Sequence, residues 1–191
     1  MRSIMMTAGI LTLTLAACGS SETEQAEAEA GSAAESAAAT ATSAPVTAVA
    51  TLQTADGQPA GIATASETDG TVRVYLQVEG LTPGEHGVHV HTIGVCEAPK
   101  FESAGPHWNP AEHKHGLEAA DGQHAGDMPN LVVAEDGTGT LEYTLEGGAT
   151  FAGLMDADGS AFMVHAMPDD QTTDPSGASG DRIACGVFTA S

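Results

Sequence analysis

The chain has very few cationic side chains. Among its 191 residues, Lys and Arg together number 5 whereas Asp and Glu number 26, which gives a formal net charge of −21 at pH 7. A domain that binds the phosphates of nucleic acid normally gathers basic side chains on one face. The charge balance therefore argues against nucleic acid as a partner, and it also opposes the approach of a small anionic substrate.

The chain also lacks an apolar run of the roughly 20 residues that a membrane span needs. A shorter apolar stretch covers residues 4–15, and small residues follow it up to Cys18. This is the pattern of a secretory signal, and Leu15-Ala16-Ala17-Cys18 resembles the lipobox of bacterial lipoproteins. We expect a signal peptide over residues 1–17, a lipid on Cys18, and a location in the periplasm or cell envelope with a membrane anchor. The alternatives are an ordinary signal peptide or a single spanning helix.

Large apolar side chains are absent from residues 19–45, where Ala, Ser, Thr, Glu and Gln dominate. Such a composition cannot bury enough surface to offset chain entropy. We predict that residues 18–45 form a disordered, lipid-attached tether that its glutamates keep extended by repulsion. An Ala-rich helix is the alternative, although no apolar stripe supports it. Residues 46–191 then form one domain with a single core.

Cysteine is scarce, with only three residues in the chain. The lipid takes Cys18, which leaves Cys96 and Cys185 as an even pair in an exported protein. A disulfide between them is predicted, and closing a loop of this length contributes on the order of 4 kcal/mol in the chain-entropy model. Two unrelated buried thiols are the alternative.

No segment of the domain shows sustained helical periodicity, which predicts an all-β fold. Residues 71–79 alternate apolar and polar side chains, as a sheet with one solvent-exposed face requires. Strands are expected over residues 46–52, 61–67, 71–79, 86–92, 130–134, 139–146, 161–166 and 182–189. Two long polar segments, 94–129 and 167–181, are predicted to be functional loops.

Six histidines and one aspartate form a candidate metal-binding set. The set comprises His89, His91, His107, His115, His124, Asp127 and His165. His89 and His91 lie two residues apart in a predicted strand and so share one face. The next four fall in the first long loop, where three imidazoles and one carboxylate match the ligands of tetrahedral zinc. His86 and His113 lie outside this spacing and are predicted not to bind metal.

Four motifs occur in order along the domain. They are His86-Gly87-Val88-His89-Val90-His91, Gly105-Pro106-His107-Trp108-Asn109-Pro110, His124-Ala125-Gly126-Asp127 and Gly180-Asp181-Arg182-Ile183-Ala184-Cys185-Gly186-Val187. In residue types and order they resemble the copper-zinc superoxide dismutases, and the insert between Cys96 and His107 is similar to the bacterial periplasmic branch. The resemblance implies a Greek-key β-sandwich or flattened barrel.

The resemblance also implies one copper and one zinc ion per subunit and a role for each ligand. Copper is expected on His89, His91, His107 and His165, and zinc on His107, His115, His124 and Asp127. His107 is then a shared imidazolate bridge, which two cations stabilise. Asp169 is expected to tie His89 to His115 from behind the metals, the alternative being a solvated loop acid.

The reaction implied is dismutation of superoxide to dioxygen and hydrogen peroxide by cycling between Cu(II) and Cu(I), which protects the cell envelope from external superoxide. Arg182 falls where the family places the arginine that meets superoxide, and Lys100 or Lys114 are candidates for assisting it. The alternative for Arg182 is surface pairing with Asp181, whose carboxylate weakens the local positive potential.

The runner-up function is a lipoprotein that sequesters copper or zinc without turnover, which needs neither the bridge nor Arg182. A homodimer is compatible with the sequence, but the sequence identifies no interface.

Overall fold

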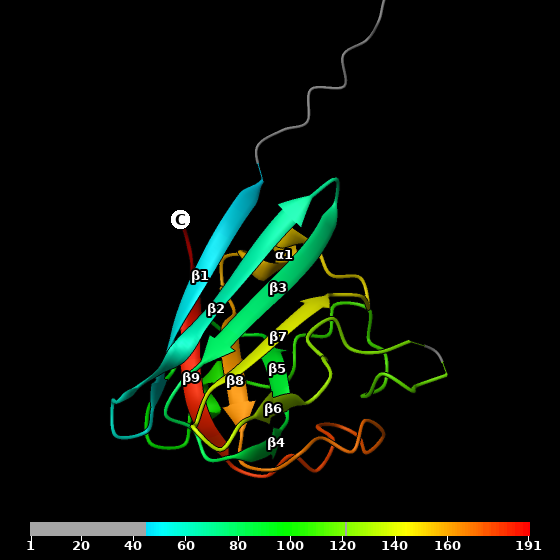
Figure 1. Cartoon of the computed structure of the whole chain (residues 1–191). Helices are drawn as coiled ribbons and strands as arrows, with labels where there is room; N and C mark the ends of the chain where they lie inside the picture. The colour runs from blue at the N-terminus through cyan, green and yellow to red at the C-terminus, as the bar shows by residue number, and fades with distance from the viewer. Residues whose placement is uncertain (1–44, 121) are drawn as a thin grey trace, which may run out of the picture. The chain divides into compact units, whose positions relative to one another are not determined.

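The computed structural model describes residues 45–120 and 122–191 (Figure 1). The predicted signal peptide (1–17), Cys18 and nearly all of the predicted tether (18–45) lie outside these ranges. No helix within them is long and apolar enough to cross a membrane. The first strand begins at Val46, where the folded domain is predicted to begin.

The described part of the chain is built almost entirely from antiparallel strands. Their bounds are β1 (Val46–Thr54), β2 (Pro59–Thr68), β3 (Thr71–Val78), β4 (Gly84–His86), β5 (Val88–His91), β6 (Leu131–Val133), β7 (Gly139–Thr144), β8 (Ala161–His165) and β9 (Arg182–Ala190). Seven strands form one sheet in the order β5-β8-β9-β1-β2-β3-β7, and β4 pairs with β6. The large sheet curls into a half-barrel (Figure 1). The predicted all-β class is confirmed.

The core lies on the inner face of the curled sheet. Strand β3 illustrates how the sequence places it, because Val72, Val74, Leu76 and Val78 are buried while the residues between them are exposed. These side chains belong to one large apolar cluster that also takes in residues of β6 and β8. The strict alternation makes this register unambiguous, since a shift by one residue would expose the whole apolar set.

The predicted strand 86–92 is divided at Gly87. The N–H of Gly87 donates to the carbonyl of Met167, and its own carbonyl accepts from the N–H of His165, both at 2.8 Å. A Cβ at this position would lie 2.8 Å from the Ser179 hydroxyl, so only glycine permits the close approach. The chain therefore leaves the small sheet here and enters the large one as β5.

Two helical turns escape the sequence-based prediction because each is too short for a periodic pattern. They are η1 (Glu102–Ala104) and α1 (Phe151–Leu154). The side chain of Thr150 caps α1 by accepting a hydrogen bond from the N–H of Gly153 at 3.1 Å. Phe151 and Leu154 point into the main core.

Candidate metal centre

The candidate ligands are carried by two paired strands and one long loop. His89 and His91 lie on β5, and His165 ends β8, which pairs with β5 in antiparallel fashion. Isolated bridges attach the loop to β5, joining His89 to Asp127 and His91 to His107. The edge of the large sheet therefore forms the platform on which the loop residues are assembled.

Four imidazoles converge in the first group of candidate ligands. They are His89, His91, His107 and His165, whose ligand atoms lie within 4.8 Å of one another, and all four side chains are buried. Nδ1 of His89 and Nε2 of the other three have no hydrogen-bond partner within residues 45–120 and 122–191. Buried polar atoms rarely stay unpaired because the lost hydration costs free energy. Four such atoms in one cluster fit a metal ion that accepts their lone pairs.

The four rings of this group are neutral at neutral pH. Burial, with repulsion from His107, lowers the pKa of His89 to about 3 and that of His165 to about 4. The same causes hold the pKa of His91 well below its usual value. Burial also lowers the pKa of His107 itself. A neutral imidazole keeps one nitrogen lone pair, which is the form that binds a metal.

Asp127 is the centre of the second group. Its Oδ1 lies 2.9 Å from Nδ1 of His107, 3.0 Å from Nδ1 of His115 and 3.3 Å from Nδ1 of His124. Ligands bound at about 2.0–2.1 Å to a tetrahedral zinc ion are roughly 3.3 Å apart, so these separations suit a tetrahedral site. The other oxygen, Oδ2, accepts from the backbone N–H groups of Gly116 and His124. That arrangement orients Oδ1 toward the three imidazoles.

The second set of candidate ligand atoms within 4.8 Å contains His89, His107, His115 and Asp127. It includes His89 instead of the predicted His124. Nδ1 of His124 and Nδ1 of His89 are both buried with no hydrogen-bond partner among the described residues. Nδ1 of His124 lies 3.3 Å from Oδ1 of Asp127, whereas His89 also belongs to the first group. His124 is therefore a candidate for the second group in place of His89.

Asp169 holds one ring of each group. Its Oδ2 lies 2.5 Å from Nε2 of His89, and its Oδ1 lies 3.0 Å from Nε2 of His115. With both Nε2 atoms donating to this carboxylate, Nδ1 is the nitrogen of each ring that is left to bind a metal ion, and it faces the ligand group of that ring. Asn130 clamps the backbone of Asp169, because its amide donates to the Asp169 carbonyl at 2.9 Å and accepts from the Asp169 N–H at 2.7 Å. Sequence reasoning missed Asn130, which carries no motif of its own.

The two carboxylates are ionised. Burial raises the pKa of Asp127 and of Asp169, but hydrogen bonds from the surrounding histidines outweigh burial and hold both well below the usual range. His115 lies between them. Burial lowers its pKa, yet its hydrogen bonds to the two carboxylates raise the pKa to about 9 overall. Without metal, this ring holds a proton that zinc has to displace.

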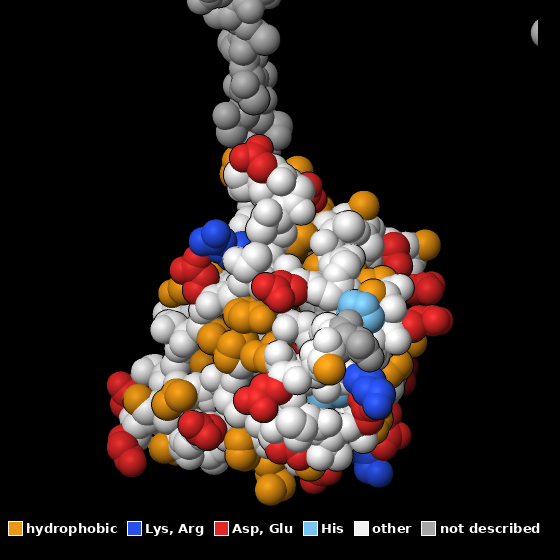
Figure 2. All heavy atoms as spheres, turned by 90° about the vertical axis from the view of Figure 1, so that its right-hand side faces the viewer, with side chains coloured by type: hydrophobic (Ala, Val, Ile, Leu, Met, Phe, Trp, Pro, Cys, Tyr) orange, Lys and Arg blue, Asp and Glu red, His pale blue; other side chains and the backbone are white. Residues whose placement is uncertain are grey.

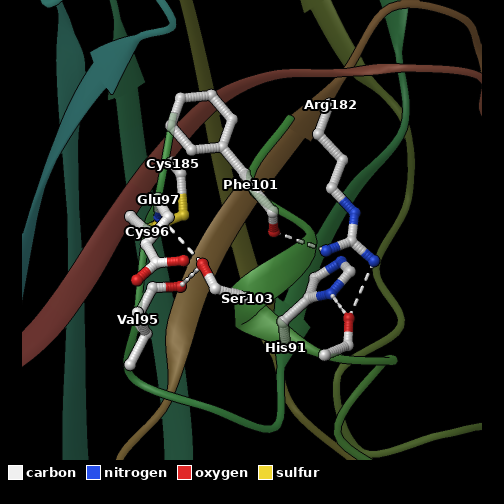
Figure 3. Close-up of a disulfide and its surroundings, with 9 residues drawn as sticks. His91, Val95, Cys96, Glu97, Phe101, Ser103, Arg182 and Cys185 are labelled. Carbon is white, nitrogen blue, oxygen red and sulfur yellow. Dashed lines mark hydrogen bonds between the residues drawn. A yellow bond between two sulfur atoms is a disulfide. The ribbon is translucent and has the colours of Figure 1, made fainter. Parts of the chain in front are cut away.

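Arg182 borders the first group. A hollow of about 430 Å³ is lined by Arg182 together with three of the four histidines. The guanidinium donates from Nη1 to the carbonyl of Phe101 at 2.6 Å and from Nη2 to the carbonyl of Gly105 at 2.7 Å. Nδ1 of His91 lies 2.8 Å from the same Gly105 carbonyl (Figure 3). One backbone oxygen thus orients both a candidate ligand and the arginine.

The charges around Arg182 are mixed. An adjoining hollow of about 640 Å³ is lined by Lys100, Glu102, Asp181 and Arg182. Lys100 lies 3.8 Å from Glu102, and no ion pair joins Arg182 to Asp181 among the described residues. Figure 2 shows acidic side chains spread over one face of the molecule with few basic ones between them. Arg182 is the one basic residue among those described that lines both hollows.

The two histidines predicted not to bind metal lie outside both groups. Nδ1 of His86 lies 2.7 Å from the carbonyl of His165, and its Nε2 lies 2.9 Å from the carbonyl of Thr82. Nδ1 of His113 lies 3.1 Å from the carbonyl of Gln123. Both rings therefore connect backbone segments.

The predicted disulfide is confirmed. Cys96 and Cys185 are bonded, with their Cα atoms 5.8 Å apart. The bond links the start of the first long loop to β9, the strand that begins at Arg182. It therefore fastens the loop that carries His107, His115, His124 and Asp127 to the strand that carries the arginine.

The chain is similar in sequence and in structure to known proteins. The family model for copper/zinc superoxide dismutase matches residues 60–188. A Cu-Zn superoxide dismutase of Caulobacter vibrioides is 43% identical over 148 residues, covering 74% of this chain and 85% of the relative. Cu-Zn superoxide dismutase 2 of Aquifex aeolicus is 40% identical over 139 residues, covering 70% and 81%. A crystal structure of a SOD-like protein from Bacillus subtilis superposes with a TM-score of 0.67 at 36% identity, covering 74% and 97%.

Proposed function

This chain belongs to the copper/zinc superoxide dismutase family and is an oxidoreductase acting on superoxide, and from that premise we propose which residues hold each metal. The proposed copper ligands are His89, His91, His107 and His165. The proposed zinc ligands are His107, His115, His124 and Asp127, so that His107 is shared. The observation that carries the assignment is the set of five buried imidazole nitrogens without a hydrogen-bond partner, because metal ions supply the partner that each one lacks.

The reaction converts two superoxide anions and two protons into one dioxygen and one hydrogen peroxide. Copper, when bound, supplies the one-electron redox chemistry, whereas zinc has none and organises the loop. Arg182 binds the anion in the hollow, with its guanidinium oriented by two backbone carbonyls. His107 can hold a proton at Nε2 during one half of the cycle and release it to the product. The positive charge of Arg182 locally offsets the repulsion from the acidic chain.

Single-ligand variants test the assignment. We expect His165→Ala to lower the copper content of the reconstituted protein while zinc stays bound, because His165 belongs to the first group alone. We expect His124→Ala to lower zinc content while copper stays bound. Elemental analysis after metal reconstitution measures both. The opposite pattern, or equal loss of both metals in each variant, would contradict the assignment.

We further propose that the chain is exported, lipid-anchored through Cys18, and protects the cell envelope from external superoxide. The lipobox-like segment ending at Cys18 supports this, as does the Cys96–Cys185 disulfide, since such bonds persist in oxidising compartments. The full chain expressed in a bacterial host should incorporate labelled fatty acid and sediment with membranes, whereas Cys18→Ser should do neither. A wild-type chain that incorporates no labelled fatty acid and stays in the soluble fraction would contradict the proposed lipid anchor.

A homodimer is also part of the proposal. Ile62 and Tyr75 are 47% and 46% exposed, and they lie on the same outer face of neighbouring strands, because Ile62 pairs with Gln77, which is two residues from Tyr75. Apolar side chains placed in this way suit a contact between two copies. Analytical ultracentrifugation should show that the wild type forms a dimer and that Tyr75→Ser weakens dimer formation. A wild-type protein that stays monomeric at high concentration would contradict the proposed dimer.

A further inference from the structure

Phe101 has an unusual backbone and an unusual environment for a loop residue. Its φ of 56° lies in the left-handed region, which a bulky aromatic residue rarely adopts. Its side chain is only 3% exposed, although it belongs to the polar loop that follows β5. A conformation of this kind persists only where the surroundings determine it strongly.

The surroundings of Phe101 are a small apolar cluster centred on the disulfide. The cluster contains Phe101, Ala104, Ala161, Met163 and Cys185, with Cys96 packed against it, and it is separate from the main core. Figure 3 shows the ring of Phe101 on the side of the loop where the disulfide lies. The disulfide and the β8 residues Ala161 and Met163 therefore hold the ring in place.

The carbonyl of Phe101 points the other way, toward Arg182. It accepts a hydrogen bond from Nη1 at 2.6 Å and another from the N–H of Ala104 at 3.2 Å. The Gly105 carbonyl holds Nη2, but a single contact would let the guanidinium rotate about it. Two carbonyls at separate positions fix the plane of the guanidinium.

We infer that Phe101 is a positioning residue for Arg182, linking the disulfide to the substrate-binding arginine. The buried ring holds the left-handed turn in place, and the turn directs the carbonyl to Nη1. This inference rests on the proposed function, because it takes Arg182 as the residue that binds superoxide. It assigns to a hydrophobic side chain of the insert a role that no ligand motif predicts.

The test removes the anchor while keeping the turn. Phe101→Gly permits a positive φ but has no side chain to bury, whereas Phe101→Leu keeps an apolar anchor. We expect Phe101→Gly to lower kcat/KM per bound copper by about tenfold, the lower end of what one hydrogen bond to a charged group contributes, with copper and zinc contents unchanged. Phe101→Leu should restore most of the rate. Combined with Arg182→Ala, Phe101→Gly should cause no further loss, because its effect passes through the arginine.

A second readout does not depend on activity. In ¹⁵N NMR spectra, the Arg182 guanidinium should show restricted rotation in the wild type and averaged signals in Phe101→Gly. Phe101→Ala serves as a milder truncation if the glycine variant loses its fold. Phe188→Ala is the matched control, since Phe188 is also 3% exposed but belongs to the main core. It should lower thermal stability and leave both the rate per copper and the Arg182 signals unchanged.

The outcomes separate this inference from the proposed function. If Arg182→Ala lowers the rate while the truncations at Phe101 do not, the inference is wrong and the role of Arg182 stands. Equal losses from Phe101→Gly with and without Arg182 would also overturn the inference. If Arg182→Ala leaves the rate unchanged, the substrate-binding role itself fails, and the inference fails with it.

Discussion

Replacing Asp169 with Asn should weaken zinc binding about 10- to 100-fold, the range seen when a hydrogen-bonding partner behind a metal ligand is lost. The carboxylate accepts from two ring nitrogens at once, those of His89 at 2.5 Å and His115 at 3.0 Å. An Asn side chain offers one oxygen and one NH₂ group, so one ring must face a donor instead of an acceptor. The shorter contact indicates that the oxygen stays with His89. His115, a proposed zinc ligand, is then the ring left without a partner.

Competition with a zinc chelator measures this effect on the purified protein. Asp170→Asn is the matched control, because in the described part of the chain the exposed carboxylate of Asp170 accepts hydrogen bonds only from Thr172 and Thr173. Its zinc affinity should equal that of the wild type. Asp169 does not support the zinc site in this way if Asp169→Asn binds zinc as tightly as the wild type, or if the Asp170 variant loses as much affinity.

Further predictions concern substrate binding, redox state, pH and local charge. Arg182→Ala should lower kcat/KM on the order of a hundredfold, as loss of a charge-stabilising donor does, and should change the dependence of kcat/KM on salt concentration. Stopped-flow measurement of superoxide decay at several ionic strengths tests both effects, and an unchanged rate or an unchanged salt dependence would contradict the prediction. Reduction of the Cys96–Cys185 disulfide, which spans 89 residues, should lower the free energy of unfolding by about 4.6 kcal/mol in the chain-entropy model. Reduction should also release zinc, so zinc retained after mild reduction would contradict this prediction. For metal-free protein, the pKa of His165 falls from 6.5 to about 4 on folding, so the unfolded chain binds the extra proton between these values. The contribution of His165 to stability is therefore complete above pH 6.5 and is lost toward pH 4, by about 3 kcal/mol. His89, whose pKa also falls on folding, adds to the decline, and a urea midpoint that does not fall between pH 6.5 and pH 4 would contradict this. Glu102→Gln should raise the rate at low ionic strength, because Glu102 lines the hollow that opens on the candidate ligands; an unchanged or lower rate would oppose that expectation.

The candidate ligands could be predicted because imidazole and carboxylate side chains are typical metal ligands and their spacing can be read from the sequence. Strand β3 could be predicted in the same way, because its Val and Leu residues alternate with polar ones. The division of the strand at Gly87 could not be predicted, because it results from hydrogen bonds to Met167 and His165, far away in the sequence.

The residues that support the site were harder to predict. Asn130 clamps Asp169 through backbone atoms, and Phe101 contributes a carbonyl to Arg182. A backbone carbonyl has the same chemistry in every residue, so only the tertiary structure reveals which one is used. The pairing of Lys100 with Glu102 is likewise invisible until the loop is folded.

The most direct measurement combines metal content with superoxide decay on the same reconstituted sample. We expect one copper and one zinc ion per chain, and dismutation that appears with copper and disappears when copper is removed. A protein that binds both metals but leaves superoxide decay at its uncatalysed rate would contradict the proposed activity and favour metal sequestration instead.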